Sequence, residues 1–253
     1  MPADLSGKRA LITGASRGIG RGCAVAMAQA GADVAVNYYS HPDDAEETAA
    51  LVRACGRRAV IVQADVADRN AVKAMVDAAV AEFGGIDVAV CNSYYSKRQA
   101  FLEIEIDQMR RTHEVTFWGA FHTAQLAARQ MVAQGQGGAL RFISSVLAAI
   151  PMPTSLPYNS AKAGMEQMVQ TIAHEMAEHR IRANSIQPGW TDTPGERQFA
   201  TAAEMETGAR DIPWGRLGTV EDMGEAAAFL CSNAADYITG ATLRIDGGFT
   251  YKH

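Results

Sequence analysis

The sequence predicts an α/β fold: a single domain over residues 1–253, with a Rossmann-like, doubly wound parallel sheet of seven strands. Short apolar segments alternate with helical segments of ten or more residues, which is typical of βαβ units with helices on both faces of a sheet. We find no internal repeat, low-complexity tract or linker, and 253 residues suit one domain of this class.

Seven segments have the length and apolar character of buried strands. They are residues 8–13, 33–37, 59–64, 86–91, 139–144, 182–187 and 241–245. Helices are expected between them, over residues 19–29, 42–54, 69–83, 106–134, 158–179 and 221–232. Gly31 is expected to end the first helix and Asp68 to cap the third, whereas residues 190–215 are expected to be irregular or weakly helical.

Composition excludes several classes of protein. A net charge of −5 with scattered lysines and arginines argues against a nucleic-acid partner. The histidines and the four cysteines show no metal-ligand spacing, so we expect reduced thiols and no metal. No signal-like start and no apolar segment of membrane-spanning length is found. We therefore expect a cytoplasmic protein with no membrane partner.

Polar and turn-forming residues follow the strands at their carboxyl ends. Because all strands of a parallel sheet end at the same edge, these residues are expected to meet where open α/β sheets bind ligands. They are Thr13, Gly14, Asn37, Asp65, Asn92, Ser145, Pro188 and Gly189.

A glycine-rich loop lies between the first strand and the first helix. Its spacing is Gly-x-x-x-Gly-x-Gly, which permits a tight turn and close approach of a pyrophosphate to the helix N-terminus. The alternative is a strand–helix turn that binds nothing. The residues expected to hold a dinucleotide here are Gly14, Ser16, Arg17, Gly18, Ile19 and Gly20.

The end of the second strand favours NADP(H), with NAD(H) as a possible second cofactor. NAD-binding sheets commonly place an acidic residue there, whereas this chain has Asn37 and Tyr38 and no carboxylate before Asp43. Arg17 adds a positive charge near the expected 2′-phosphate, although it is equally compatible with a solvated loop arginine.

Tyr158 and Lys162 form an i,i+4 pair that shares one helix face, with Ser145 thirteen residues before the tyrosine. Acid/base work near pH 7 requires the tyrosine pKa to fall by about 3 units from its usual value near 10. A lysine supplies part of this shift, and a cationic cofactor would supply more. Taken alone, the pair is also compatible with a solvated surface contact.

Taken together, these motifs resemble the short-chain dehydrogenase/reductase family over about residues 5–250. The resemblance is carried by the glycine loop, Asp65-Val66, Asn92, Ser145, Tyr158-x-x-x-Lys162, the run from Pro188 to Thr193 and Asp246-Gly247-Gly248. It implies strand order 3-2-1-4-5-6-7 and an NAD(P)-dependent enzyme acting on CH–OH or C=O groups.

The resemblance also implies roles for single residues. Tyr158 would be the general acid/base, Lys162 would lower its pKa and bind the nicotinamide ribose, and Ser145 would position the substrate oxygen. The remaining cofactor contacts that it implies are Asp65 and Val66 at the adenine, Asn92 near the adenosine ribose, and Pro188, Gly189, Thr191 and Thr193 toward the nicotinamide.

Two positions depart from the family pattern. Tyr94 stands where the family has a glycine, so Tyr94 and Tyr95 either form a wall of the substrate pocket or merely cover the sheet end. Thr116 stands where the family has the asparagine of its catalytic tetrad, so the proton relay is expected to be rerouted, slower or lost. With Ser145, Tyr94 and Tyr95, the expected substrate pocket includes Leu147 and Trp190.

Residues 190–215 are expected to form a substrate lid over a small carbonyl or alcohol. Bacterial glucose 1-dehydrogenases are similar to this chain at Asn37-Tyr38, Ile150–Pro153 and Ile238–Leu243. A wider similarity reaches 3-oxoacyl-carrier-protein reductases, although His174 replaces the arginine that those enzymes use for the carrier protein.

Two further expectations remain. A cofactor-binding protein with little catalysis is the alternative of another class. Apolar residues on the helices around Trp118 and Met168 favour a homotetramer over a purely internal role.

Overall fold

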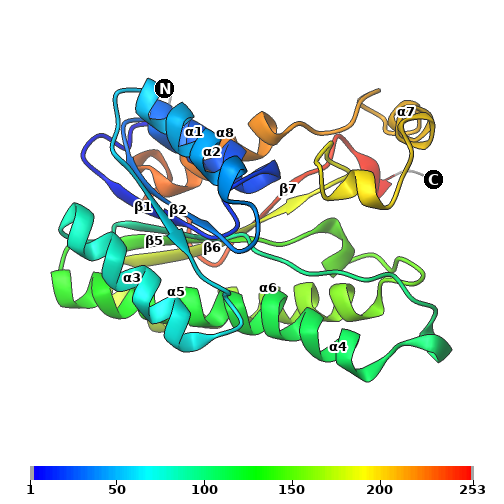
Figure 1. The fold of residues 1–253 in the computed structure, drawn as a ribbon, viewed down its shortest axis with the longest axis horizontal. Helices are drawn as coiled ribbons and strands as arrows, with labels where there is room; N and C mark the ends of the chain where they lie inside the picture. Colours follow the sequence, from blue (N-terminus) through cyan, green and yellow to red (C-terminus); the bar gives the residue numbers. More distant parts are fainter. Residues whose placement is uncertain (1–2, 252–253) are drawn as a thin grey trace.

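A single sheet of seven parallel strands lies at the centre of the computed structural model, which describes residues 3–251 (Figure 1). Its order is β3-β2-β1-β4-β5-β6-β7, which confirms the order that the family resemblance implied. β1 pairs with both β2 and β4, so the order reverses between β1 and β4. The strands are β1 Arg9–Ile12, β2 Asp33–Tyr38, β3 Ala59–Gln63, β4 Val88–Cys91, β5 Gly138–Ile143, β6 Ile181–Pro188 and β7 Thr242–Ile245.

Helices cover both faces of the sheet (Figure 1). One face carries α1 Gly18–Gln29, α2 Pro42–Ala54 and α8 Val220–Cys231. The other carries α3 Arg69–Phe83, α5 Gly119–Gln134 and α6 Leu156–Glu175, with α4 Ile106–His113 preceding α5. Along β1, Leu11 packs under α3, α5 and α6, whereas Ala10 and Ile12 pack under α1, α2 and α8. This alternation buries the inner strands between two apolar layers, whereas the edge strands β3 and β7 stay partly exposed.

The sequence-based helix limits need two corrections. The run predicted as one helix over 106–134 contains a π-helical turn, Glu114–Trp118, between α4 and α5. The helix after Tyr158 ends at Glu175 and is followed by the 3₁₀ turn Ala177–His179. Further 3₁₀ turns are Phe101–Glu103, Val146–Ala148, Glu196–Gln198, Asn233–Ala235 and Phe249–Tyr251.

The 190–215 segment contains a regular helix, α7 Ala202–Arg210, which is more ordered than predicted. Thr201 and Glu204 form a capping box, in which each side chain bonds the other residue's backbone N–H. The Thr-x-x-Glu spacing was the sequence signal for this helix start.

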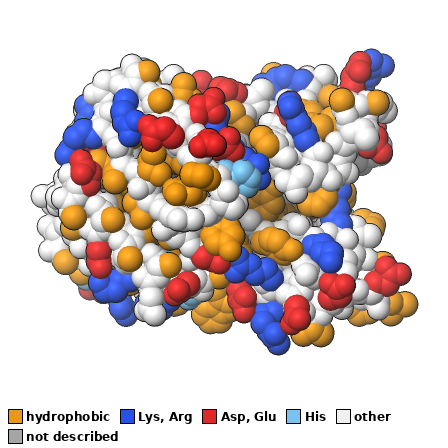
Figure 2. Space-filling view, viewed as in Figure 1, with side chains coloured by type: hydrophobic (Ala, Val, Ile, Leu, Met, Phe, Trp, Pro, Cys, Tyr) orange, Lys and Arg blue, Asp and Glu red, His pale blue; other side chains and the backbone are white. Residues whose placement is uncertain are grey.

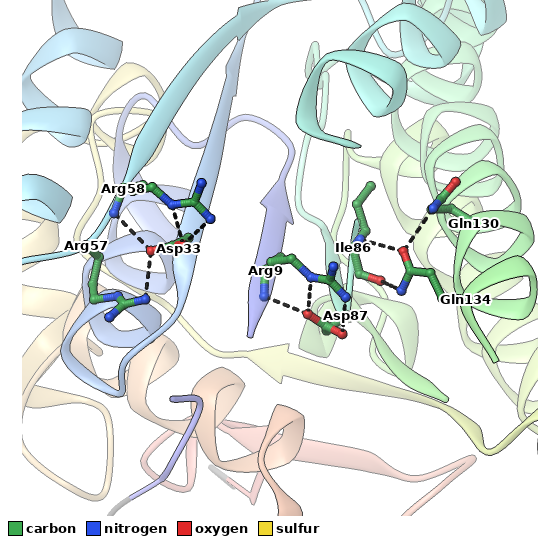
Figure 3. Close-up of polar contacts among 8 residues, drawn as sticks. All are labelled: Arg9, Asp33, Arg57, Arg58, Ile86, Asp87, Gln130 and Gln134. Carbon is green, nitrogen blue, oxygen red and sulfur yellow. Dashed lines mark hydrogen bonds and ion pairs between the residues drawn. The ribbon is translucent and has the colours of Figure 1, made fainter. Parts of the chain in front are cut away.

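Ion pairs tie the strands together at the edge opposite the polar strand ends (Figure 3). Arg9 binds Asp87 through two side-chain bonds, Nε to Oδ2 at 2.7 Å and Nη2 to Oδ1 at 2.9 Å. Asp33 accepts from both Arg57 and Arg58, each at 2.8 Å. The first cluster joins the beginnings of β1 and β4, and the second joins the beginnings of β2 and β3, so each stabilises one pair of strands.

No helix within residues 3–251 combines the length and the apolar character that crossing a bilayer requires. The four cysteines are free thiols, as expected, and three of them are buried.

α1 and α8 approach so closely that two glycines are required. A Cβ on Gly224 would lie 2.3 Å from the carbonyl oxygen of Gly22. Gly224→Ala should therefore cost about 1–3 kcal/mol of stability by overpacking, although alanine is the better helix former by about 1 kcal/mol. At about 2–4 °C per kcal/mol, we expect the Tm to fall by roughly 5 °C in a thermal melt. Glu225→Ala, on the exposed side of the same helix, is the control. An unchanged Tm for Gly224→Ala would contradict the close packing.

Candidate active site

A cavity of about 1000 Å³ opens at the carboxyl ends of the strands. Figure 2 shows the surface hollowed between the part that carries α7 and the part that carries α4. Nearly all residues predicted for the site line this cavity. They are Gly14, Ser16, Arg17, Gly18, Ile19, Asn37, Asp65, Val66, Asn92, Tyr94, Tyr95, Ser145, Leu147, Tyr158, Lys162, Pro188, Gly189, Trp190, Thr191 and Thr193. Gly20, Tyr38 and Thr116 are not in the lining.

The glycine loop is held open by side chains of neighbouring strands. Asn92, directly after β4, donates from Nδ2 to the carbonyl oxygens of Thr13 (2.9 Å) and Gly14 (3.0 Å). Gly18 has φ +59°, and a Cβ on Gly20 would lie 2.2 Å from the Gly14 oxygen. Gly20 therefore does not line the cavity, but its lack of a side chain lets the glycine loop pack against the start of α1.

The first turn of α1 is free to bind an anion. Arg17, at its N-cap, makes no side-chain capping bond, and the turn contains no acidic residue. The carbonyl oxygen of Ser16 points away from the cavity toward α2, because it accepts from Thr48 Oγ1 and Arg21 Nη2, each at 2.9 Å. The exposed N–H groups and the positive helix end suit a pyrophosphate. Arg21 and Thr48 were not recognised from the sequence, since neither belongs to the glycine motif.

Asn37 fixes the end of β2. Its Oδ1 accepts from the Gly14 N–H at 3.1 Å, and its Nδ2 donates to the carbonyl oxygens of Val62 and Ala64. Its polar atoms therefore bind backbone. Tyr38 packs toward the core, and the residues that line the cavity at this point are Tyr39, Ser40 and His41.

Asp65 forms an ion pair with Arg111 of α4, at 2.8 Å. The Arg111 guanidinium lies 5.9 Å from the centre of the Tyr39 ring, and all three side chains line the cavity. They make a polar part of the lining at the β2–β3 end of the site. Arg111 escaped the sequence analysis because its partner is 46 residues away.

Ser145, Tyr158 and Lys162 converge beyond the end of β5. Ser145 precedes a 3₁₀ turn and accepts from the Leu147 N–H at 3.1 Å, and its side chain is close enough to Tyr158 to influence the pKa of the phenol. Tyr158 and Lys162 lie one turn apart on α6, with Nζ 5.5 Å from the centre of the tyrosine ring. Lys162 is fully buried, and its Nζ donates to the carbonyl oxygen of Ile143.

Burial favours the neutral forms of both groups. Burial raises the pKa of Tyr158, with Tyr94 adding to the effect, while the nearby Ser145 side chain lowers it. Burial also lowers the pKa of Lys162 to about 7. In the protein without bound ligands, the Tyr158 pKa is therefore shifted opposite to the direction that catalysis requires. Burial of the phenol is the main cause, and Lys162, whose Nζ is turned toward the Ile143 carbonyl, does not offset it.

Thr116 lies on the π-helical turn and is fully buried. Its hydroxyl accepts from the Tyr95 N–H at 3.1 Å and donates to the Tyr95 carbonyl at 3.2 Å. The Tyr95 hydroxyl in turn donates to Gln108 at 2.7 Å. Thr116 thus fixes the segment after β4, and its part in a proton relay stays a prediction.

Tyr94 packs edge-on against Tyr158, with ring centres 5.9 Å apart and planes at 73°. Of the two roles considered for this residue, the contact favours a wall of the substrate pocket over a cover for the sheet end.

The residues around the cavity fit a dinucleotide. The α1 N-terminus has no side-chain cap, and the buried Ser144 hydroxyl, which lines the cavity, has no hydrogen-bond partner among residues 3–251. Within the same residues, no cluster of three or more His, Cys, Asp or Glu side chains has the arrangement of a metal site.

Comparisons with known proteins agree with this geometry. Residues 14–250 match a family model described as enoyl-(acyl carrier protein) reductase. The chain is 40% identical to an L-rhamnose 1-dehydrogenase (NAD(P)(+)) of Sphingomonas sp. strain SKA58, covering 96% of each chain. It is 36% identical to glucose 1-dehydrogenase 2 of Bacillus subtilis strain 168, covering 99% of this chain and 97% of that one.

The fold agrees with crystal structures over nearly the whole chain. A short-chain type dehydrogenase/reductase from Mycobacterium marinum superposes with a TM-score of 0.92 at 39% identity, covering 98% of this chain and 97% of that one. A putative short-chain alcohol dehydrogenase from Sinorhizobium meliloti 1021 gives a TM-score of 0.94 at 38% identity, covering 99% of each chain.

The buried Lys162 should destabilise the protein in a pH-dependent way. Its folded pKa of about 7 lies below the unfolded value of 10.5, so between these limits the unfolded chain binds more protons. The destabilisation is therefore complete below pH 7 and fades toward pH 10.5. Lys162→Met should raise stability at pH 6.5 by an amount on the order of 2 kcal/mol, and by less than half of that at pH 9.5.

Urea unfolding at the two pH values measures this effect without added dinucleotide. Lys73→Met, on the exposed side of α3, serves as the control, since its ammonium stays in water. A gain that is equal at both pH values would show that Lys162 is not held in a desolvated site.

Proposed function

The chain belongs to the short-chain dehydrogenase/reductase family and is an NAD(P)-dependent oxidoreductase that acts on CH–OH groups, and we propose that it prefers NADP(H) and acts on a sugar. The observation that carries the proposal is the convergence of Ser145, Tyr158 and Lys162 on one wall of a cavity that continues to the glycine loop.

The roles of the three side chains follow from their chemistry. Tyr158 gives or takes the proton at the substrate oxygen. Ser145, close to Tyr158, donates to the same oxygen and holds it beside the phenol. Lys162 holds the nicotinamide ribose, and its protonated form favours the phenolate through electrostatic attraction. The nicotinamide, when bound, supplies or accepts the hydride.

Oxidation of an alcohol requires a Tyr158 phenolate, although the protein alone favours the phenol. Positive charge must therefore reach the site together with the ligands, either as a protonated Lys162 or as the oxidised nicotinamide. This requirement explains how a buried phenol stays protonated in the free enzyme and becomes a base only in the complex.

The surroundings of Arg17 support NADP(H). Arg17 lines the cavity and forms no ion pair within residues 3–251. Tyr39, Ser40 and His41 line the neighbouring wall, whereas Asp43 and Asp44 do not reach the lining. A 2′-phosphate would therefore meet an unpaired guanidinium and no carboxylate at the end of β2.

Two of the relatives described above support a sugar as the substrate, since they are an L-rhamnose and a glucose 1-dehydrogenase. The second candidate is a 3-oxoacyl thioester, which the description of the family model favours. The lining of the cavity adds nothing in favour of a thioester, since Arg98, the arginine next to Phe199, is paired with Glu196. A cofactor-binding protein with weak catalysis is the remaining alternative, supported by Thr116 being engaged with Tyr95.

Self-association belongs to the proposal as well. Trp118 is half-exposed and packs edge-on against Phe117 and Phe121, so the outer face of α5 and its π-helical turn carries an aromatic surface. Such a surface suits contact with a second copy in a homotetramer.

Tyr158→Phe should lower kcat by at least about 10³-fold, because the proton donor and acceptor is lost while the ring remains. NADPH fluorescence titration should give a Kd within about threefold of the wild-type value, since the phenol is not needed to hold the pyrophosphate. The assay uses D-glucose and L-rhamnose with NADP and with NAD. Retained turnover would remove Tyr158 from the catalytic role.

Arg17→Ser should raise the KM for NADP(H) by about tenfold or more and leave the KM for NAD(H) within threefold, because only the 2′-phosphate needs the guanidinium. Arg17→Lys, which keeps the charge without the planar fork, should fall between the two. Wild-type KM values that are equal or lower with NAD(H) would contradict the cofactor preference.

A further inference from the structure

The segment after β4 reaches across the cavity to the segment after β6. Arg98 Nη2 lies 3.3 Å from Glu196 Oε1, and the Arg98 guanidinium stacks over the Phe199 ring with 4.3 Å to its centre. Tyr94 makes a second contact across the cavity. Its hydroxyl lies so near Gly195 that a Cβ added to Gly195 would be 2.2 Å from the Tyr94 Oη. These contacts join residues about a hundred positions apart in the chain.

The same side chain reaches the reacting centre, since Tyr94 packs edge-on against Tyr158. One aromatic ring thus fills the space between the general acid/base and the 190–215 segment. A substrate must fit beside this ring, so its bulk is limited near the reacting carbon.

The Arg98–Glu196 pair retains hydrogen-bonding capacity. The guanidinium has five N–H donors, and its one hydrogen bond within residues 3–251 is the bond to Glu196. Glu196 uses Oε1 in that bond, which leaves Oε2 as an acceptor. Both side chains line the cavity, each with 28% of its surface exposed, so a donor and an acceptor are offered together to a ligand.

The first turn after β6 fixes the position of this acceptor. The Glu196 N–H donates to Thr193 Oγ1 at 3.1 Å, and Thr193 in turn faces Gly18 of the glycine loop. The backbone of Glu196 is therefore anchored to the same residue that approaches the dinucleotide site. Because the Glu196 carboxylate is paired with Arg98, the pair carries no net charge and suits an uncharged substrate.

We propose that Tyr94, Arg98 and Glu196 form a specificity wall that selects small, uncharged polyhydroxy substrates. Tyr94 limits the size of the substrate, and the Arg98–Glu196 pair binds one of its hydroxyls other than the reacting one. This inference rests on the proposed dehydrogenase function and names the side chains that select the substrate of that site.

The first test uses three alcohols with six-membered rings: D-glucose, L-rhamnose and cyclohexanol. For each variant, kcat/KM for the sugar is divided by kcat/KM for cyclohexanol, which lacks the additional hydroxyl groups. Arg98→Met keeps the apolar stem over Phe199 but removes every donor, so the sugar-to-cyclohexanol ratio should fall at least tenfold. Glu196→Gln keeps the shape and should lower the ratio about threefold or more. Arg197→Met is the matched control, because Arg197 is exposed, pairs with Asp192 and does not line the cavity; its ratio should stay within twofold of wild type.

A ratio unchanged in Arg98→Met overturns the role of the pair. D-Gluconate, a hydroxy acid, tests whether Arg98 binds a carboxylate instead of a hydroxyl group. If Arg98→Met reduces turnover of D-gluconate more than turnover of the sugars, Arg98 binds a carboxylate and the inference is wrong.

The second test probes the contact between Tyr94 and Gly195. Gly195→Ala should lower kcat/KM for the better sugar at least tenfold, because the new methyl group meets Oη. In a Tyr94→Phe background the nearest atom becomes the ring carbon, 3.4 Å away, and the same change should cost threefold or less. Equal losses in both backgrounds contradict this contact, and thermal melts establish that each variant is folded.

A different result would show that the proposed dehydrogenase function itself is wrong. A wild-type protein that turns over none of these alcohols, with NADP or NAD, lacks that function. The wall is then tested by binding, through the fluorescence of Trp190, which lines the cavity, in NADP-loaded protein titrated with D-glucose or L-rhamnose. Arg98→Met should weaken this binding at least tenfold, whereas equal affinity, or no sugar binding by the wild type, overturns the inference.

Discussion

The site depends on one hydrogen-bonded junction between β1 and β4, the two strands between which the sheet reverses its order. The Thr13 hydroxyl donates to the Val90 carbonyl and accepts from the Asn92 N–H at 2.9 Å, while the Asn92 side chain binds the Thr13 and Gly14 carbonyls. These bonds take the place of ladder bonds where the strands diverge. They hold the glycine loop open on one side and direct the chain toward Tyr94 on the other. The dinucleotide end and the substrate end of the cavity are thus fixed by the same few buried bonds.

The buried Lys162 lowers the stability of the fold while it equips the site for acid/base chemistry. Lys162 is fully buried, and the bond from its Nζ to the Ile143 carbonyl does not replace the water that a lysine side chain normally keeps. Tyr158 beside it is held in the protonated form by burial and by Tyr94. Because burial disfavours the charged forms of both groups, their pKa values change strongly when a charged ligand enters the cavity. Such a pair suits an acid/base centre that must become active only when its ligands are present.

Sequence reasoning found what depends on local pattern and missed what depends on distant partners. The loop around Gly18 and the Tyr158–Lys162 pair could be predicted, because each is carried by residues within one motif. The positions of the strands followed from the apolar pattern, whereas their order followed from the family resemblance. The Asp65–Arg111 and Arg98–Glu196 pairs could not, because their members lie 46 and 98 residues apart on segments with no periodic signal. The raised pKa of Tyr158 in the protein without ligands could not be read from the motif either, since burial, its main cause, is a property of the folded chain.

The most direct measurement for the central claim is a crystal structure of this protein with NADP bound. The account predicts the pyrophosphate at the N-terminus of α1, the 2′-phosphate beside Arg17, and the nicotinamide between Tyr158 and Thr193. It also predicts that Asn92 keeps its bonds to the glycine loop. A dinucleotide bound in the reverse direction, or outside the cavity at the carboxyl ends of the strands, would contradict it.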